Sequence, residues 1–161
     1  MEKQVRLNLF SGEKREGYVN IDINPDTKPD IVANVVCLNM YADGTVDEVV
    51  CSHGLEHLFP HELVKAVKEI HRVLKPSGKA YFSCPNIHWV YEDLKSNVME
   101  NGKNVNWGFY DNAIYGNKRW VGDEHKSHFY PLSLKELLVY VGFTVQEYGD
   151  EKMSECVAVK K

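Results

Sequence analysis

Residues 46–86 read VDEVVCSHGLEHLFPHELVKAVKEIHRVLKPSGKAYFSCPN, and their pattern runs in the order strand, loop, helix, turn and strand. Val46, Val49 and Val50 make a short apolar run, which is typical of a strand buried on both faces. Residues 80–84 make a second run of strand length. The segment therefore predicts two strands with a helix between them.

The predicted helix has clear limits at both ends. Pro60 suits its first turn, and the Lys-Pro-Ser-Gly of residues 75–78 ends it, because proline cannot continue a helix and glycine permits a turn. Between these two ends lies one apolar stripe at helical spacing: Leu63, Val67, Ile70 and Leu74. A helix that joins two parallel strands makes a right-handed crossover. Sheets of this kind bind ligands at the carboxyl ends of their strands, here residues 51–53 and 84–86.

The bulk properties of the chain exclude several classes of protein. Its 161 residues predict a single domain over 1–161, and its formal net charge of −4 argues against a nucleic-acid partner. No apolar run approaches the roughly 20 residues of a membrane span, and the N-terminal sequence is not a signal peptide. The four cysteines form no Cys-x-x-Cys pair, which favours reduced thiols in a cytoplasmic protein.

The rest of the sequence predicts one more helix, at residues 133–141, and further strands at residues 5–10, 18–23, 30–35, 143–148 and 156–159. Ser133 and Glu136 fit a capping box, and the last two strands are expected to pair as a hairpin. The gaps between the first three strands are shorter than the dozen or so residues of a helical crossover. Parallel strands there must be joined by loops, which leaves one side of the sheet poorly covered.

The segment 86–131 has no clear periodicity and contains every tryptophan of the chain. Its aromatic residues form either a satellite core or the wall of a substrate pocket. We expect this insert to cap the substrate side of the domain, with Tyr110, Tyr115 and Trp120 as the candidates for substrate contact.

Five segments, taken in order, resemble the class I S-adenosylmethionine-dependent methyltransferases, and most closely the small ones with a compact start. They are LNLFSGEKREGYVNIDINP, PDIVANV, DGTVDEVVCSHGLEHL, EIHRVLKPSGKAYFSCPN and FYPLSLKELLVYVGF. The resemblance implies an α/β, Rossmann-like methyltransferase fold. Its sheet would be mostly parallel and seven-stranded, with an antiparallel last strand and reduced helices near the N-terminus. It also implies S-adenosylmethionine as the cofactor.

The same resemblance implies which residues contact the cofactor. Gly12 would let backbone amides approach the ligand closely. Phe10 stands where the family usually has another glycine, so its ring either crowds the methionine portion of the cofactor or serves as a core residue at the end of a strand. The expected cofactor-binding residues are Leu9, Phe10, Ser11, Gly12, Asp22, Ile23, Asn34, Val35, Ser52 and His53.

Two of these residues have a second interpretation. An acid at Asp22, the end of the second strand, can accept hydrogen bonds from both ribose hydroxyls, or it can cap the turn at Asn24. Asn34 stands where the family often has an acid near the adenine amino group. Its carbonyl can accept that bond, or it can serve as an ordinary turn asparagine.

Residues 53–57, HGLEH, also match His-x-x-Glu-His, an inverted zinc-protease signature. That motif needs both histidines on one face of a long helix. Here His53 directly follows a strand, and Pro60 comes three residues after His57. A zinc hydrolase is therefore a remote alternative, and no metal site is predicted.

Three histidines are the catalytic candidates: His53, His125 and His128. By resemblance His53 would face the reactive end of the cofactor, where a group that titrates near neutrality can act as a general base or orient an acceptor. It could equally serve only to hydrogen-bond a loop. His125 and His128 end the insert and could reach over the cleft as part of a polar rim; a metal site built from them and nearby acids is only weakly indicated.

Two functions remain open from the sequence. The first is methyl transfer to an oxygen or nitrogen nucleophile of a small molecule. The second is a non-catalytic binding protein on the same fold that has lost its cofactor, as Phe10 and the early first strand suggest. In the first case the cofactor needs a cover, which the insert, a partner chain or a homodimer would supply.

Overall fold

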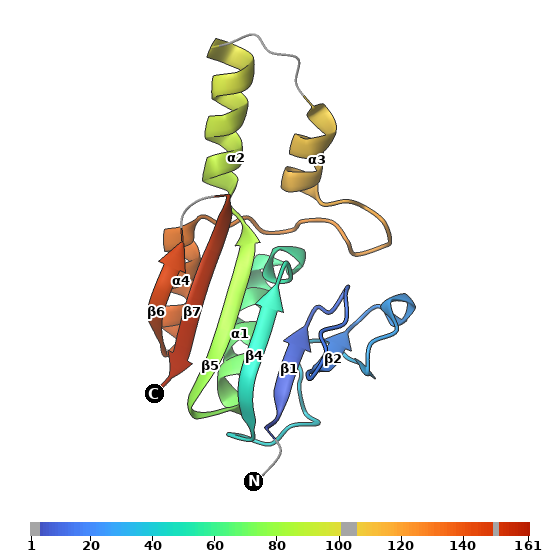
Figure 1. The fold of residues 1–161 in the computed structure, drawn as a ribbon, viewed down its shortest axis with the longest axis vertical. Coiled ribbons are helices and arrows are strands. Elements are labelled where there is room, and N and C mark those ends of the chain that lie inside the picture. The colour runs from blue at the N-terminus through green and yellow to red at the C-terminus, as the bar shows by residue number, and fades with distance from the viewer. Residues whose placement is uncertain (1–3, 101–105, 150–151) are drawn as a thin grey trace.

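The computed structural model describes residues 4–100, 106–149 and 152–161, with the backbone alone at residues 98–100. A seven-stranded sheet with the order β3-β2-β1-β4-β5-β7-β6 lies at its centre (Figure 1). The strands are β1 (Arg6–Leu9), β2 (Val19–Asp22), β3 (Ile31–Val32), β4 (Val46–Ser52), β5 (Leu74–Pro85), β6 (Phe143–Gly149) and β7 (Met153–Lys160). β7 pairs antiparallel with β5 and β6, and the other pairings are parallel, which confirms the expected topology.

Helices are confined to one face of the sheet and to the insert. The helical elements are η1 (Pro25–Thr27), η2 (Leu55–His57), α1 (Pro60–Val73), α2 (Ile87–Leu94), η3 (Lys95–Glu100), α3 (Trp107–Tyr115) and α4 (Pro131–Val141). Figure 1 shows α1 and α4 together behind the sheet, while α2 and α3 project beyond its upper edge. None of the helices within the described residues is both long and apolar enough to cross a membrane.

The predicted crossover is formed by β4, α1 and β5. The helix begins at Pro60, and the carboxylate of Glu62 accepts the N–H of Phe59 at 3.0 Å. It ends one residue before the predicted apolar stripe does, because Leu74 already belongs to β5 and pairs with Val46. β5 is therefore longer than the run predicted at residues 80–84.

The core lies between the sheet and the two helices behind it. It consists of fully buried apolar side chains, each worth about 1.5–3 kcal/mol when removed from water: Leu7, Leu9, Val49, Phe82, Val67, Ile70, Leu134 and Leu138. Cys51, Cys84 and Cys156 are buried free thiols of the same layer, and Cys37 is an exposed one.

The near face of the sheet has polar side chains in place of helices. Arg6 lies over the ring of Tyr18 at 4.8 Å, and the hydroxyl of Tyr18 donates to Glu48. The hydroxyl of Tyr81 donates to Glu155 at 2.6 Å. The prediction of loop connections and an uncovered side is thus confirmed: β1, β2 and β3 are parallel neighbours without α-helices between them.

The start of α4 differs from the prediction. The helix begins at Pro131, so Ser133 is its third residue and not its N-cap. The hydroxyl of Ser133 accepts the N–H of Tyr130 at 3.1 Å and donates to the carbonyl of the same residue. The end of the helix is as predicted, because Gly142 follows it with a φ of 117°.

Candidate functional site

A cavity of about 1060 Å³ lies at the carboxyl ends of β1, β2 and β4. Small-molecule sites commonly measure about 300–1,000 Å³, so this one has room for a nucleoside-sized ligand and a second small molecule. β1 has β2 on one side and β4 on the other, so the order of the strands reverses there. This is the position at which open α/β sheets bind ligands.

The loop after β1 forms one wall of the cavity. Phe10 has a φ of 54° and lies against Gly54, where an added Cβ would clash with the phenyl ring. Gly12 differs, because a Cβ there would meet nothing within 4 Å. Ser11 also lines the cavity, and its buried hydroxyl has no hydrogen-bond partner among the described residues. Leu9 is the exception among the expected contacts, since it belongs to the core and does not line the cavity.

Asp22 lines the cavity at the end of β2 and also holds its own turn. Its Oδ1 accepts the N–H of Asn24 at 2.8 Å, so the turn-capping interpretation is correct, although it does not exclude a ligand contact. Burial raises the pKa of Asp22, and the backbone N–H groups of Asn24 and Ile23 partly offset that effect. Ile23, beside it, exposes its apolar side chain to the cavity edge.

Asn34 likewise holds a turn and lines the cavity. Its Oδ1 accepts the N–H of Val36 at 3.1 Å, which is the turn role foreseen as an alternative. A carbonyl oxygen has a second lone pair, so a further hydrogen bond to a ligand is still open. Val35 follows it and presents an apolar surface to the same cavity.

His53 stands at the end of β4, in contact with the cavity. Its backbone has a φ of 52°, and its N–H donates to the carbonyl of Ser83 at 2.9 Å. Its Nδ1 lies 3.5 Å from Oε1 of Glu56, and this carboxylate raises the pKa of His53. Ser52 lines the cavity as well and shares a hydrogen bond with the Ser83 hydroxyl at 2.8 Å.

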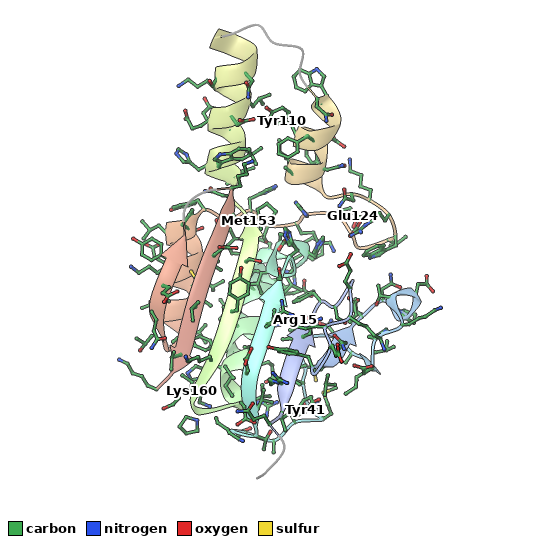
Figure 2. All side chains as sticks on the ribbon, viewed as in Figure 1. Arg15, Tyr41, Tyr110, Glu124, Met153 and Lys160 are labelled. Atoms are coloured by element: carbon green, nitrogen blue, oxygen red, sulfur yellow. The ribbon has the colours of Figure 1, made fainter. Side chains whose placement is uncertain are left out.

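The second half of the insert contributes residues to the cavity wall. The chain after α3 crosses the strand ends, where Figure 2 labels Glu124. Residues 119–123 and Lys126 line the cavity. The buried Asp123 fixes this loop, because its Oδ2 accepts the backbone N–H of Arg119 at 3.0 Å and the Nε of Arg119 at 3.2 Å.

His125 and His128 lie elsewhere than their predicted roles require. The ring of His125 is within hydrogen-bond distance of the carbonyl of Ala113, at 3.1 Å, and that of His128 is 2.7 Å from the carbonyl of Ile114. Both therefore hold the end of α3, and neither lines the cavity. Burial lowers the pKa of His125.

Of the aromatic candidates in the insert, one reaches the cavity. Trp120 lines it, with the guanidinium of Arg119 over its ring at 4.4 Å. Tyr110 lies between α2 and α3 (Figure 2), where its hydroxyl donates to Asp93 at 2.6 Å. Tyr115 is exposed, with Lys118 over its ring. The satellite-core interpretation thus describes Tyr110, and the pocket-wall interpretation describes Trp120.

The His-x-x-Glu-His letters do not form a protease site. Residues 55–57 are a single 3-10 turn, η2, so His53 and His57 do not share a helical face. The fold instead brings His125, from the loop after α3, to Glu56 and His57. Sequence reasoning missed this cluster, because nothing in the spacing of residues 56 and 125 indicates that they meet.

Comparison with known proteins supports the resemblance to methyltransferases, independently of the geometry of the cavity. Residues 13–82 match the family model described as a methyltransferase domain. No curated protein sequence matches the chain significantly.

Solved structures give a closer match in shape than in sequence. An S-adenosylmethionine-dependent methyltransferase from Methanosarcina mazei is 17% identical with a TM-score of 0.69, and the alignment covers 99% of this chain and 94% of that one. A Burkholderia thailandensis 1,6-didemethyltoxoflavin-N1-methyltransferase, solved with its substrate and S-adenosylhomocysteine, is 15% identical with a TM-score of 0.64, covering 98% and 71%. The cyclase SpnF is 14% identical with a TM-score of 0.62, covering 99% and 76%. At these identities the likeness shows the fold, and SpnF shows that this fold also serves other chemistry.

Proposed function

We propose that this chain is a class I S-adenosylmethionine-dependent methyltransferase that transfers a methyl group to an oxygen or nitrogen nucleophile of a small molecule, which the matched methyltransferase domain and the shared fold support. The observation that carries the proposal is the cavity at the switch point of the sheet, with Asp22 at one side and His53 at the other. Its volume accommodates both a cofactor and an acceptor.

The residues that line the cavity fit S-adenosylmethionine. Asp22 offers carboxylate oxygens to the ribose, and Ile23 and Val35 offer apolar surfaces to the adenine ring. Asn34 has carbonyl capacity left for the adenine amino group. The unpartnered Ser11 hydroxyl and the open space beside Gly12 suit the amino-acid portion of the cofactor.

When bound, S-adenosylmethionine supplies a methyl group activated on a sulfonium. The protein then has to align an acceptor with it and exclude water. Residues 119–123 line the cavity and would provide the cover, which supports the proposal that the insert is the substrate-side cap of the domain. His53 would contact the acceptor, because its exposed imidazole lines the cavity while Glu56 holds its Nδ1 side.

The alternative, a binding protein without cofactor, depends on Phe10 as an obstruction. Phe10 is one of the lining residues, but its ring packs against Gly54 and the cavity beside it still measures about 1060 Å³. The ring therefore forms part of the wall and does not fill the space. This geometry favours the enzyme over the binding protein.

Calorimetric titration of the protein with S-adenosylhomocysteine tests the cofactor site. We expect binding that weakens at least 10-fold, about 1.4 kcal/mol, in Asp22→Ala. Asp22→Asn is the matched variant, because its amide oxygen still accepts the N–H of Asn24 and keeps the turn. Equal affinity in the unmodified protein and Asp22→Ala would remove Asp22 from the site, and no binding at millimolar ligand would contradict the proposal.

A further inference from the structure

Glu56, His57 and His125 form a cluster beside the proposed site, of which the proposed methyl transfer uses only Glu56, as the partner of His53. Each offers a ligand atom, and the three atoms lie within 4.8 Å of one another. Two of them come from η2, and the third comes from the loop after α3, which crosses the ends of the strands in Figure 1. The cluster thus joins two parts of the chain that are 68 positions apart in sequence, from residue 57 to residue 125.

Glu56 is the least exposed acid in the described part of the chain, at 1% of its surface. Neither of its carboxylate oxygens has a hydrogen-bond partner of conventional geometry among the described residues, although the buried Cys84 thiol contacts the carboxylate. Its one ion-pair contact there is Nδ1 of the exposed His53, at 3.5 Å. A buried carboxylate is costly unless a cation or several donors share its site, and the single, solvent-exposed His53 leaves Glu56 only partly compensated.

The two histidines are oriented as metal ligands usually are. Nδ1 of His57 lies 3.3 Å from the carbonyl of Glu124, and Nδ1 of His125 lies 3.1 Å from the carbonyl of Ala113. A carbonyl only accepts, so Nδ1 must be the protonated nitrogen in each ring, and Nε2 keeps its lone pair. A backbone carbonyl on the far nitrogen is the common second-shell arrangement of ligating histidines. The centroids of the two rings are 5.1 Å apart and the ring planes are inclined at 71°.

We propose that Glu56, His57 and His125 bind one zinc ion, with water in the fourth position. Two imidazoles and one carboxylate are a donor set that zinc accepts, with bonds of about 2.0–2.2 Å and ligand atoms roughly 3.4 Å apart. The present spacing of up to 4.8 Å requires each side chain to move inward by about 1 Å. The ion would neutralise Glu56 and tie the loop that contributes to the cavity wall to η2. The ligand set differs from that of the protease signature, because His53 is not part of it.

Zinc titration of the chelator-treated full chain, in competition with a chromophoric indicator, tests the proposal. The background carries Cys37→Ser, because Cys37 is an exposed thiol that could bind zinc by itself. We expect one equivalent of zinc to bind with a dissociation constant below about 1 μM, as three protein ligands support. Binding of no zinc, at up to 100-fold molar excess, would overturn the proposal.

Asparagine variants separate ligation from structure. In His125→Asn and His57→Asn the side-chain amide still donates to the carbonyl that Nδ1 contacts, but the Nε2 ligand is gone. His128→Asn is the matched control, because His128 contacts the neighbouring carbonyl of Ile114 and lies outside the cluster. We expect zinc affinity to fall at least 100-fold in His125→Asn, His57→Asn and Glu56→Gln, and to stay unchanged in His128→Asn.

Two outcomes of that comparison would contradict the site. One is unchanged zinc affinity in His125→Asn, and the other is an equal loss in His128→Asn, which would indicate a disturbed loop in place of a lost ligand. Far-ultraviolet circular dichroism and the cooperativity of urea unfolding establish that each variant is folded. Because zinc binding is measured without S-adenosylhomocysteine, its failure would leave the proposed methyl transfer unaffected.

Discussion

The amino ends of the parallel strands form one edge of the sheet and their carboxyl ends form the other, and polar side chains are paired differently at the two. At the amino edge the guanidinium of Arg72 donates to Glu69, Asp43 and the carbonyls of Leu38 and Tyr41. Lys75 pairs with Asp47 at 2.6 Å, and Lys160 donates to the carbonyls of Arg72 and Leu74. Figure 2 labels Tyr41 and Lys160 at this lower edge, some way apart.

At the carboxyl edge, by comparison, several buried polar atoms lack hydrogen-bond partners of conventional geometry among the described residues. They include the hydroxyl of Ser11 and both oxygens of Glu56. Phe10 and His53 also adopt left-handed backbone conformations there, which cost about 1–3 kcal/mol each in residues other than glycine. Among the described residues, the amino edge also has a buried atom without a hydrogen-bond partner, Nε of Arg6, and a left-handed residue, Ser77, so the edges differ in that one carries the ion pairs and the other the cavity.

Gly54→Ala is expected to give the largest effect, because it adds a Cβ where the Phe10 ring lies. Overpacking of this kind costs roughly 2–3 kcal/mol of unfolding free energy, and the displaced ring should also weaken binding of S-adenosylhomocysteine. Urea unfolding and calorimetry measure the two effects. Gly12→Ala is the matched control at the same cavity, since its Cβ would meet nothing within 4 Å.

A double variant gives that prediction its decisive test. In Phe10→Ala the two ring contacts of the added Cβ are gone and only its contact with the Cβ of residue 10, at 2.9 Å, remains, so Gly54→Ala should cost less there than it does beside the phenyl ring. An equal cost of Gly54→Ala with and without the phenyl ring would show that the contact with Phe10 is not the reason for glycine at this position.

Arg72→Met, at the opposite edge, should act on stability alone. Methionine keeps much of the packed alkyl stem but loses every hydrogen bond of the guanidinium, and the 28% exposure of the Arg72 side chain limits the loss to about 1–2 kcal/mol. Affinity for S-adenosylhomocysteine should stay within 2-fold of the unmodified protein. A parallel loss of affinity would abolish the distinction between the two edges.

Glu69→Gln should give the smallest effect, which is present at neutral pH and disappears in acid. The hydrogen bond from Arg72 lowers the pKa of Glu69 below its ordinary value of 4.5. The carboxylate therefore contributes stability that is fully present above pH 4.5 and is lost as the pH falls through the folded pKa. Between pH 6 and pH 3 the unfolding free energy of Glu69→Gln should fall less steeply than that of the unmodified protein. Parallel slopes would contradict this assignment.

The sequence predicted the elements well where a local pattern sets them. Pro60 and the apolar stripe after it located α1, and the last two strands form the predicted hairpin. The predicted start of α4 was wrong. The serine that fits a capping box by spacing, Ser133, accepts the N–H of Tyr130 equally well from the third helical position. Asp22 and Asn34 were each assigned two roles, and the structure forms the turn of both.

What the sequence determined by itself is the order of the elements and the positions at which strands end, because periodicity and turn residues act over a few neighbouring positions. From these follow the parallel sheet, its switch point and the wall residues Phe10 to Gly12. Only the tertiary structure decided which distant groups meet: Phe10 on Gly54, His125 beside Glu56, and the loop of residues 119–123 at the wall of the cavity. Such contacts depend on how loops fold back across the sheet, and no local pattern encodes that path.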